Sequence, residues 1–286
     1  MWMSQQEQSP SDYKLLLGEE LTTRRKDADK TRVEAAEALG CSEAKIGTIE
    51  RGRSAISLLE LRGLLALYDV PAPQRAEIEA LALNARKRRP PTPWGSTVPP
   101  RLKQYFHVEE TAREIRHHHT FLLHGLVQTE DYARAVIGHN RALRPAEVER
   151  LVEARMARQA WLKNGRPTRL TEVVPEAVLR SRLGGGDVMR GQLAHLTDLV
   201  SREVIDLRVV PIGAGMYSCG GYCFTILTRA AEQRSAVVYL ENLTDGVFVD
   251  DETRVEQYET AFAEMLDLAL SPEVTLELLT KVAAEL

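Results

Sequence analysis

The sequence predicts a mainly α-helical first domain followed by a larger domain of the α+β class. The chain has 286 residues, of which 44% are hydrophobic and 27% are charged, which is typical of one or two globular domains. Apolar residues recur at helical spacing from residue 13 to about residue 87, whereas short runs of β-branched residues appear after residue 169. Five prolines within residues 90–100 separate the two parts, because such a stretch cannot continue a helix.

The same patterns divide the chain into four segments. Residues 1–12 are rich in Gln, Ser and Pro and predict a disordered tail. Residues 13–87 predict a compact helical domain, residues 88–100 a basic, proline-rich linker, and residues 101–286 a second full domain. The run from Arg86 to Lys103 holds six basic residues and no acidic one. This charge suits either a solvated linker or a strap that lies beside a DNA duplex.

Two short helices in the first domain are joined by a very tight turn. Thr31 and Glu34 have the spacing of a capping box at the start of the first helix. Gly40 suits the left-handed position that ends this helix, and Ser42 can cap the next one two residues later. Two helices joined so closely predict a helix-turn-helix unit.

The second domain begins with helices and continues with alternating strands and helices. Helices are predicted over residues 102–116, 129–137, 145–162, 187–200, 253–270 and from 272 to the C-terminus. Strands are predicted over residues 170–174, 204–212, 221–227, 236–240 and 246–249. We therefore expect a small sheet between helical ends.

Composition excludes several classes of protein. The longest uncharged stretch, residues 209–228, contains Pro211 and four glycines and is no candidate for a membrane helix. The N-terminal residues lack the basic-then-apolar pattern of a secretory signal. The odd set of Cys41, Cys219 and Cys223 argues against a disulfide framework and offers no zinc-like spacing. These features predict a cytoplasmic protein with no membrane contact.

The stretch from Thr31 to Arg53 resembles the repressor-like helix-turn-helix family, which includes phage repressors and the xenobiotic-response-element (XRE) regulators. The similarity covers about residues 17–67, and the I-x-x-I-E-R-G motif at residues 46–52 is specific to this family. The resemblance implies a five-helix domain in which the segment from Ser42 to Arg51 lies in the major groove. It also implies a structural pair between Glu50 and Arg25.

The resemblance further assigns DNA contacts to two sets of residues. Those implied to face the bases are Glu43, Ala44, Lys45 and Thr48. Those implied to hold phosphates, and so to fix the register without reading sequence, are Arg32, Ser42, Arg51 and Arg53. A lysine suits guanine acceptors, while Glu43 either accepts from a cytosine amine or favours the helix N-terminus. Arg32 departs from the family, in which Gln is common.

The second domain carries its own signature. Residues 125–133 are Gly-Leu-Val-Gln-Thr-Glu-Asp-Tyr-Ala, residues 237–241 are Val-Val-Tyr-Leu-Glu, and residues 270–273 are Leu-Ser-Pro-Glu. Together they resemble the actinobacterial antitoxin-like regulators whose C-terminal domain is called DUF5753. The resemblance covers nearly the whole chain and implies transcription regulation and a small DUF397-like partner protein. His124 replaces the usual Pro, which puts the shape of the turn before Gly125 in question.

The second domain shows no catalytic motif, since a G-x-S-x-G elbow, a phosphate-binding loop and H-E-x-x-H are all absent from the sequence. We therefore expect no enzymatic activity and no cofactor. The run His117-His118-His119 does not predict a metal site, because only His117 and His119 would share one face of a strand. Arg155 and Arg158 share one helix face. This short patch suits an anionic ligand, an acidic partner protein or simply a solvated surface.

The net charge of −4 hides an uneven distribution. Residues 1–90 carry 15 basic and 14 acidic residues, whereas residues 91–286 carry 22 and 27, so the total does not argue against DNA as a partner. The first hypothesis is a sequence-specific, homodimeric regulator that binds double-stranded DNA and whose C-terminal domain binds a partner protein or ligand. The second hypothesis is an antitoxin-like interaction protein that sequesters a small DUF397-type partner and binds DNA for autoregulation.

Overall fold

The computed structural model of the protein describes residues 10–87, 98, 100–163, 169–228, 236–242 and 245–286. The chain divides into two compact units, the first ending at Pro91 and the second holding nearly all of the remainder. Residues 1–9 of the tail predicted over residues 1–12, and residues 88–97 and 99 of the predicted linker, lie outside the described residues. None of the helices in the described ranges is long and apolar enough to cross a membrane.

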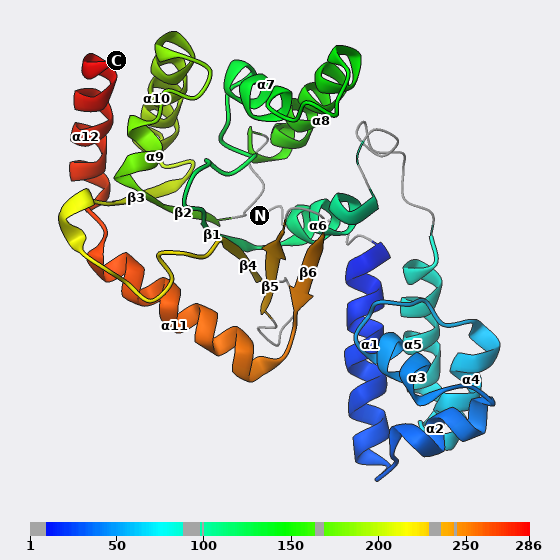
Figure 1. The fold of residues 1–286 in the computed structure, drawn as a ribbon. Coiled ribbons are helices and arrows are strands. Elements are labelled where there is room, and N and C mark those ends of the chain that lie inside the picture. The colour runs from blue at the N-terminus through cyan, green and yellow to red at the C-terminus, as the bar shows by residue number, and fades with distance from the viewer. Residues whose placement is uncertain (1–9, 88–97, 99, 164–168, 229–235, 243–244) are drawn as a thin grey trace, which may run out of the picture. The chain divides into compact units, whose positions relative to one another are not determined.

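The first unit consists of five helices (Figure 1). They are α1 (Pro10–Asp27), α2 (Arg32–Leu39), α3 (Glu43–Glu50), α4 (Leu58–Leu67) and α5 (Ala72–Ala85). Helix α1 begins at Pro10, so residues 10–12 are helical and do not belong to a disordered tail. Their helical state follows the strong preference for proline in a first helical turn.

Local signals fix the turn between α2 and α3. The Thr31 hydroxyl accepts from the Glu34 amide and the Glu34 carboxylate accepts from the Thr31 amide, which completes the capping box. Gly40 adopts φ 62°, the left-handed conformation that ends α2, and the Ser42 side chain accepts from the Lys45 amide. Both ends of the turn are therefore set by residues whose chemistry requires them there.

Close packing against α1 holds α3 in place. A Cβ atom at Gly18 would lie 2.3 Å from the Glu50 carbonyl oxygen, so only glycine permits this approach. Leu17 and Leu21 from α1 join Ile46 and Ile49 from α3 in one buried cluster. The last turn of α3 is thereby pressed onto the middle of α1.

The second unit is built on a six-stranded sheet with the strand order β3-β2-β1-β4-β5-β6. The strands are β1 (Glu114–His118), β2 (Arg169–Pro175), β3 (Asp206–Val210), β4 (Phe224–Thr228), β5 (Ala236–Glu241) and β6 (Gly246–Val249). Strands β1, β2 and β3 run parallel, while β4, β5 and β6 add antiparallel pairs. The sheet is therefore mixed, and β1 lies at its centre.

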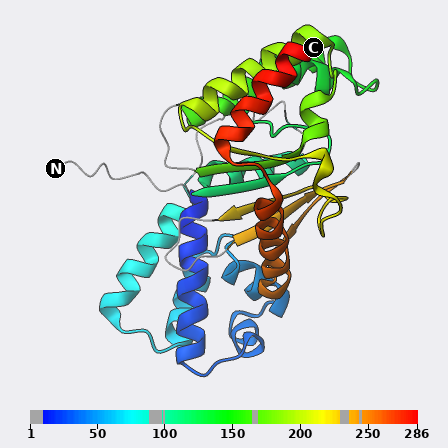
Figure 2. The ribbon, with the colours of Figure 1, turned by 90° about the vertical axis from the view of Figure 1, so that its left-hand side faces the viewer.

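Helices cover both faces of this sheet (Figures 1 and 2). They are α6 (Pro100–Thr111), α7 (Glu130–Gly138), α8 (Pro145–Lys163), α9 (Glu176–Arg180), α10 (Gly186–Ser201), α11 (Glu252–Leu268) and α12 (Pro272–Glu285). Helix α11 packs on one face, where Phe262 and Met265 meet Phe224 and Ile226 of β4. The other face packs against α6, α8, α10 and α12 through a second cluster.

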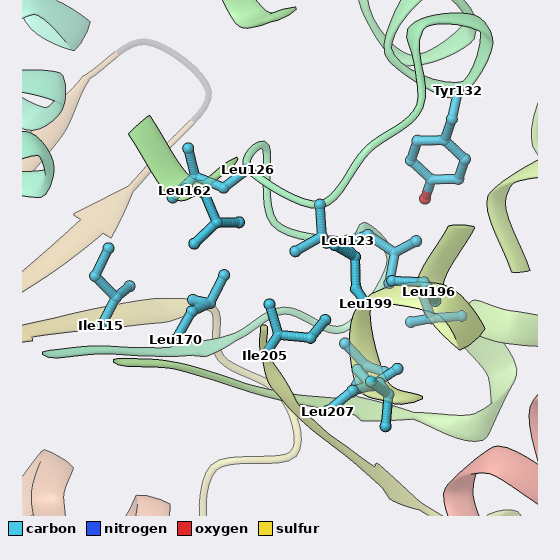
Figure 3. Packing of buried hydrophobic residues seen from close by; sticks show 14 of the residues in the cluster. Ile115, Leu123, Leu126, Tyr132, Leu162, Leu170, Leu196, Leu199, Ile205 and Leu207 are labelled. Atoms are coloured by element: carbon cyan, nitrogen blue, oxygen red, sulfur yellow. The ribbon is translucent and has the colours of Figure 1, made fainter. Parts of the chain in front are cut away.

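This second cluster is the largest hydrophobic cluster among the described residues (Figure 3). Ile115, Leu170 and Leu207 point from neighbouring strands to one side of the sheet, the side on which Leu162 of α8 and Leu196 and Leu199 of α10 lie. The alternation of strand side chains sends one set of residues into this cluster and the other set toward α11.

The prediction of a helix over residues 102–116 is wrong at its end. Helix α6 stops at Thr111, and Glu114 begins the central strand. The strand was missed because Glu-Ile-Arg-His-His contains a single aliphatic residue, while buried strands are normally rich in aliphatic residues. Polar contacts of its histidines, described below, allow it to lie at the centre of the sheet.

Candidate functional sites

The exposed side of α3 carries most of the residues implied to contact DNA. Glu43, Ala44 and Lys45 are exposed in its first turn, Thr48 is partly exposed one turn later, and Ser42 caps the helix. Ile46 and Ile49 occupy the opposite, buried side. The helix therefore presents its N-terminal half to solvent, as insertion into a major groove requires.

Basic residues flank this surface. Arg51 and Arg53 are exposed directly after α3. The Arg51 guanidinium lies against Gly47, where a Cβ atom would be 3.1 Å from Nη1. Gly47 thus leaves space for a basic side chain beside the exposed side of α3, a packing role that the sequence did not reveal.

A buried charge cluster fixes α3 from behind. Arg25 donates to Glu50 with 2.6 Å between Nε and Oε1, and its Nη1 donates to the Lys30 carbonyl. The Arg25 and Glu50 side chains are 11% and 3% exposed. The structure thus brings together the two residues implied to form a structural pair.

Arg32 also joins this cluster. Its Nε atom donates to Oε2 of Glu50 at 2.6 Å, although its side chain is 40% exposed. The family resemblance implied only a phosphate contact for Arg32, and its pairing with Glu50 was not predicted. Its Nε atom pairs with Glu50, and a guanidinium has further N–H donors beside this one.

Lys45 forms an ion pair within the free protein. Its Nζ atom lies 2.5 Å from Oε1 of Glu60, the residue that closes the Ser57 capping box at the start of α4. This pair holds the pKa of Glu60 down at about 2, chiefly through the hydrogen bond from Lys45. A base contact by Lys45 therefore requires that this ion pair is given up or shared.

In the second unit, the loop between β1 and α7 is clamped by buried polar side chains. The Gln159 amide of α8 donates to the carbonyls of Gly125 and Gln128. Gln192 of α10 accepts from the Thr129 amide and donates to the Val127 carbonyl. These contacts give the Gly-Leu-Val-Gln-Thr stretch a single conformation, because its buried backbone groups find partners there.

The same loop forms one wall of a cavity of about 140 Å³. Three side chains in register across the sheet form its floor, since His117 of β1 pairs with Thr225 of β4 and Thr225 pairs with Tyr239 of β5. His117 Nδ1 and Thr225 Oγ1 are 2.9 Å apart. His119, which directly follows β1, lines the cavity as well.

Arg155 and Arg158, which the spacing predicted to share one helix face, both line this cavity. Arg158 is 5% exposed, forms an ion pair with Glu109 at 3.0 Å and lies over the Phe106 ring at 3.9 Å. Arg155 is partly buried and donates to Gln128 at 2.7 Å. The interpretation as a solvated surface is therefore wrong for Arg158, because the fold turns this helix face inward.

Comparison with known proteins finds a matching family model for each of the two units. A family model described as "Domain of unknown function (DUF5753)" matches residues 102–281, which is more than half of the chain. The chain belongs to the DUF5753 family. A second model, described as "Helix-turn-helix domain", matches residues 16–78 and supports DNA binding by the first unit. The chain matched no curated protein and no solved structure.

Burial favours the neutral form of four histidines of the DUF5753 domain. Burial lowers the pKa of His117 and His118, that of His119 to about 4, and that of His124 despite its contact with Glu109. His118 points away from the cavity and bonds the Val173 carbonyl through Nδ1. Among the described residues, no group of these or other side chains could hold a metal ion.

Two buried acids of the DUF5753 domain were missed in the sequence. Burial would raise the pKa of Glu109, but Arg158, His124 and Tyr105 together hold it below the ordinary value. Burial raises the pKa of Glu172 to about 8, even though the His124 amide donates to it at 2.6 Å. A lone acid within the apolar run of β2 was the available signal for Glu172.

Proposed function

We propose that this protein is a sequence-specific transcriptional regulator in which α3 enters the major groove of double-stranded DNA. The observation that carries the proposal is the exposed N-terminal half of α3, held rigidly by the buried Arg25–Glu50 pair. Lys45 is placed to donate to guanine acceptors, with Glu43, Ala44 and Thr48 beside it. Arg32, Ser42, Arg51 and Arg53 surround this surface and suit phosphate oxygens.

The proposal includes a homodimer. Most regulators with this motif bind two half-sites about one helical turn apart, so that a palindromic operator matches a two-fold symmetric protein. Sedimentation equilibrium with and without a selected operator would test this part. A monomer on a single half-site would contradict it.

The proposed base contact is tested by paired variants on DNA obtained by genomic selection with the purified protein. Lys45→Ala should weaken operator binding by about tenfold to a hundredfold while changing binding to random DNA much less. Arg53→Ala should weaken both and reduce the salt slope of log K by about 1. Lys26→Ala removes the same charge from the exposed end of α1 and serves as the matched control. Equal losses on both DNAs for Lys45→Ala would remove this residue from the base-reading surface.

The second candidate function is an antitoxin-like interaction protein, which one surface feature of the DUF5753 domain favours. Phe121 and Tyr222 are 75% and 66% exposed. They lie on adjacent loops, because Thr120 and Cys223 are in contact at 3.4 Å. Exposed aromatic residues of this kind suit a protein partner.

Gel filtration of the full chain with the product of a neighbouring small gene, of the DUF397 type, tests this candidate. A complex that forms with the wild-type protein and is lost on Phe121→Ser with Tyr222→Ser would support it. Failure of the wild-type chain to form the complex would count against it.

A further inference from the structure

The cavity of the DUF5753 domain has the size of a one-ring molecule. Its volume is about 140 Å³, and a cavity of roughly 150 Å³ in another protein accepts benzene. Tyr105, Phe106 and Tyr239 are among the aromatic residues that line it. The Tyr105 and Tyr239 ring centroids are 4.4 Å apart. Such a wall suits the faces and edges of a planar ring.

The polar part of the wall favours an anion. Arg158 is matched by Glu109 in an ion pair. Arg155 forms no ion pair with any carboxylate in the described part of the chain, and its recorded hydrogen bond is to the neutral Gln128. Burial lowers the pKa of Arg155 to about 10, which leaves it charged at neutral pH. Glu241 also lines the cavity with its side chain exposed at the rim, and the charges of Glu241 and Glu109 partly offset the effect of burial on the pKa of Arg155.

The neighbouring histidine adds a neutral donor. The amides of Phe121 and Leu122 both donate to Nδ1 of His119, at 3.0 and 3.1 Å. Since Nδ1 accepts, the proton of the neutral ring lies on Nε2. Arg155 therefore offers a guanidinium without a carboxylate partner among the described residues, and His119 carries an imidazole N–H; an anionic ligand accepts from both kinds of donor.

We infer that this cavity binds a small single-ring carboxylate, with the carboxylate facing Arg155 and the ring among Tyr105, Phe106 and Tyr239. The fork of an arginine matches a carboxylate in two parallel hydrogen bonds. This inference goes beyond the proposed function, because it names the chemical class of a ligand for the DUF5753 domain.

Isothermal titration of the full chain with four probes tests the inference without any substitution. Benzoate, benzamide and benzamidine have the same size and differ in charge, while acetate keeps the carboxylate and lacks the ring. We expect benzoate to bind, with benzamide and acetate about tenfold weaker or more and benzamidine without measurable binding. Absence of benzoate binding at millimolar concentration, or equal binding of benzamide, benzamidine or acetate, would overturn the inference.

Matched variants locate the site. Arg155→Gln should weaken benzoate binding about tenfold or more, whereas Arg150→Gln, on the exposed side of the same helix, should leave it unchanged. Equal effects of the two variants would refute the placement. If Arg155→Gln fails to fold, Glu241→Gln at the rim replaces it and should strengthen benzoate binding, since it removes a nearby negative charge; unchanged or weaker binding would overturn the placement. DNA affinity measured without any ligand tests the regulator function separately from the cavity.

Discussion

Replacement of Glu50 by glutamine would test how α3 is held. The substitution keeps the size of the side chain and one acceptor, but it removes the charge shared by Arg25 and Arg32. Arg25 is 11% exposed and would keep a buried positive charge without its partner. Breaking a buried pair in this way costs about 3 to 5 kcal/mol.

The contribution of Arg32 is smaller. Its side chain is 40% exposed, and exposed ion pairs contribute about 0 to 1 kcal/mol. We therefore expect Glu50→Gln to lower the free energy of unfolding of the first unit by about 3 kcal/mol, mainly through Arg25. A domain of ordinary stability would remain folded, with a greatly increased opening of α3.

Hydrogen exchange measured by mass spectrometry resolves this effect within one molecule. Peptides covering α2 and α3 should exchange about a hundredfold faster in the variant, while peptides from α10 and β3 in the second unit should be unchanged. Glu37→Gln, at an exposed position of α2, is the control of equal charge. If Glu50→Gln and Glu37→Gln have the same small effect, the buried pair does not hold the helix.

Three further predictions follow from particular contacts. Gly18→Ala should destabilise the first unit, because its Cβ would lie 2.3 Å from the Glu50 carbonyl oxygen; a melting temperature equal to that of wild type would contradict this. Glu60→Gln keeps a residue able to cap α4 but releases Lys45 from its ion pair. DNA affinity in a fluorescence anisotropy titration should therefore rise a few-fold. A fall in affinity would refute the idea that Glu60 competes with DNA for Lys45. The pKa of Glu172 lies at about 8, above its ordinary value of 4.5, so the folded protein retains a proton that the unfolded chain releases. Its contribution to stability is complete below pH 4.5 and falls as the pH rises toward 8. Between pH 6.5 and 8 the loss should be about 2 kcal/mol, and Glu172→Gln should abolish this decline in thermal melts; an unchanged decline would refute the assignment.

The helix-turn-helix was predictable because its signals are local. Thr31, Glu34, Gly40 and Ser42 act within three residues of their own position, and each takes the role that its chemistry suggests. The packing around them is not local. The contact of Arg32 with Glu50 and the close approach at Gly18 depend on how α1 and α2 lie against α3.

The DUF5753 domain was predicted less completely, since its polar residues are buried by partners far away in the chain. The central strand contains one aliphatic residue. Its histidines can be buried because His117 forms a hydrogen bond with Thr225 and His118 forms one with the Val173 carbonyl. Helix spacing placed Arg155 and Arg158 on one face, but it could not tell that this face turns inward. The alignment of His117, Thr225 and Tyr239 across three strands depends on how β1, β4 and β5 pair, and the sequence alone did not predict this pairing.

The central claim is that the first turn of α3 lies at the base edges of the major groove. Disulfide trapping would test this claim most directly. A protein carrying Ala44→Cys in a Cys41→Ala background would be mixed with a selected operator that bears a thiol tethered to a major-groove cytosine. Glu37→Cys in the same background, on the exposed side of α2, is the control. The account predicts a crosslink from position 44 and none from position 37. A crosslink from position 37 alone, or none from position 44 on an operator that is bound, would contradict it.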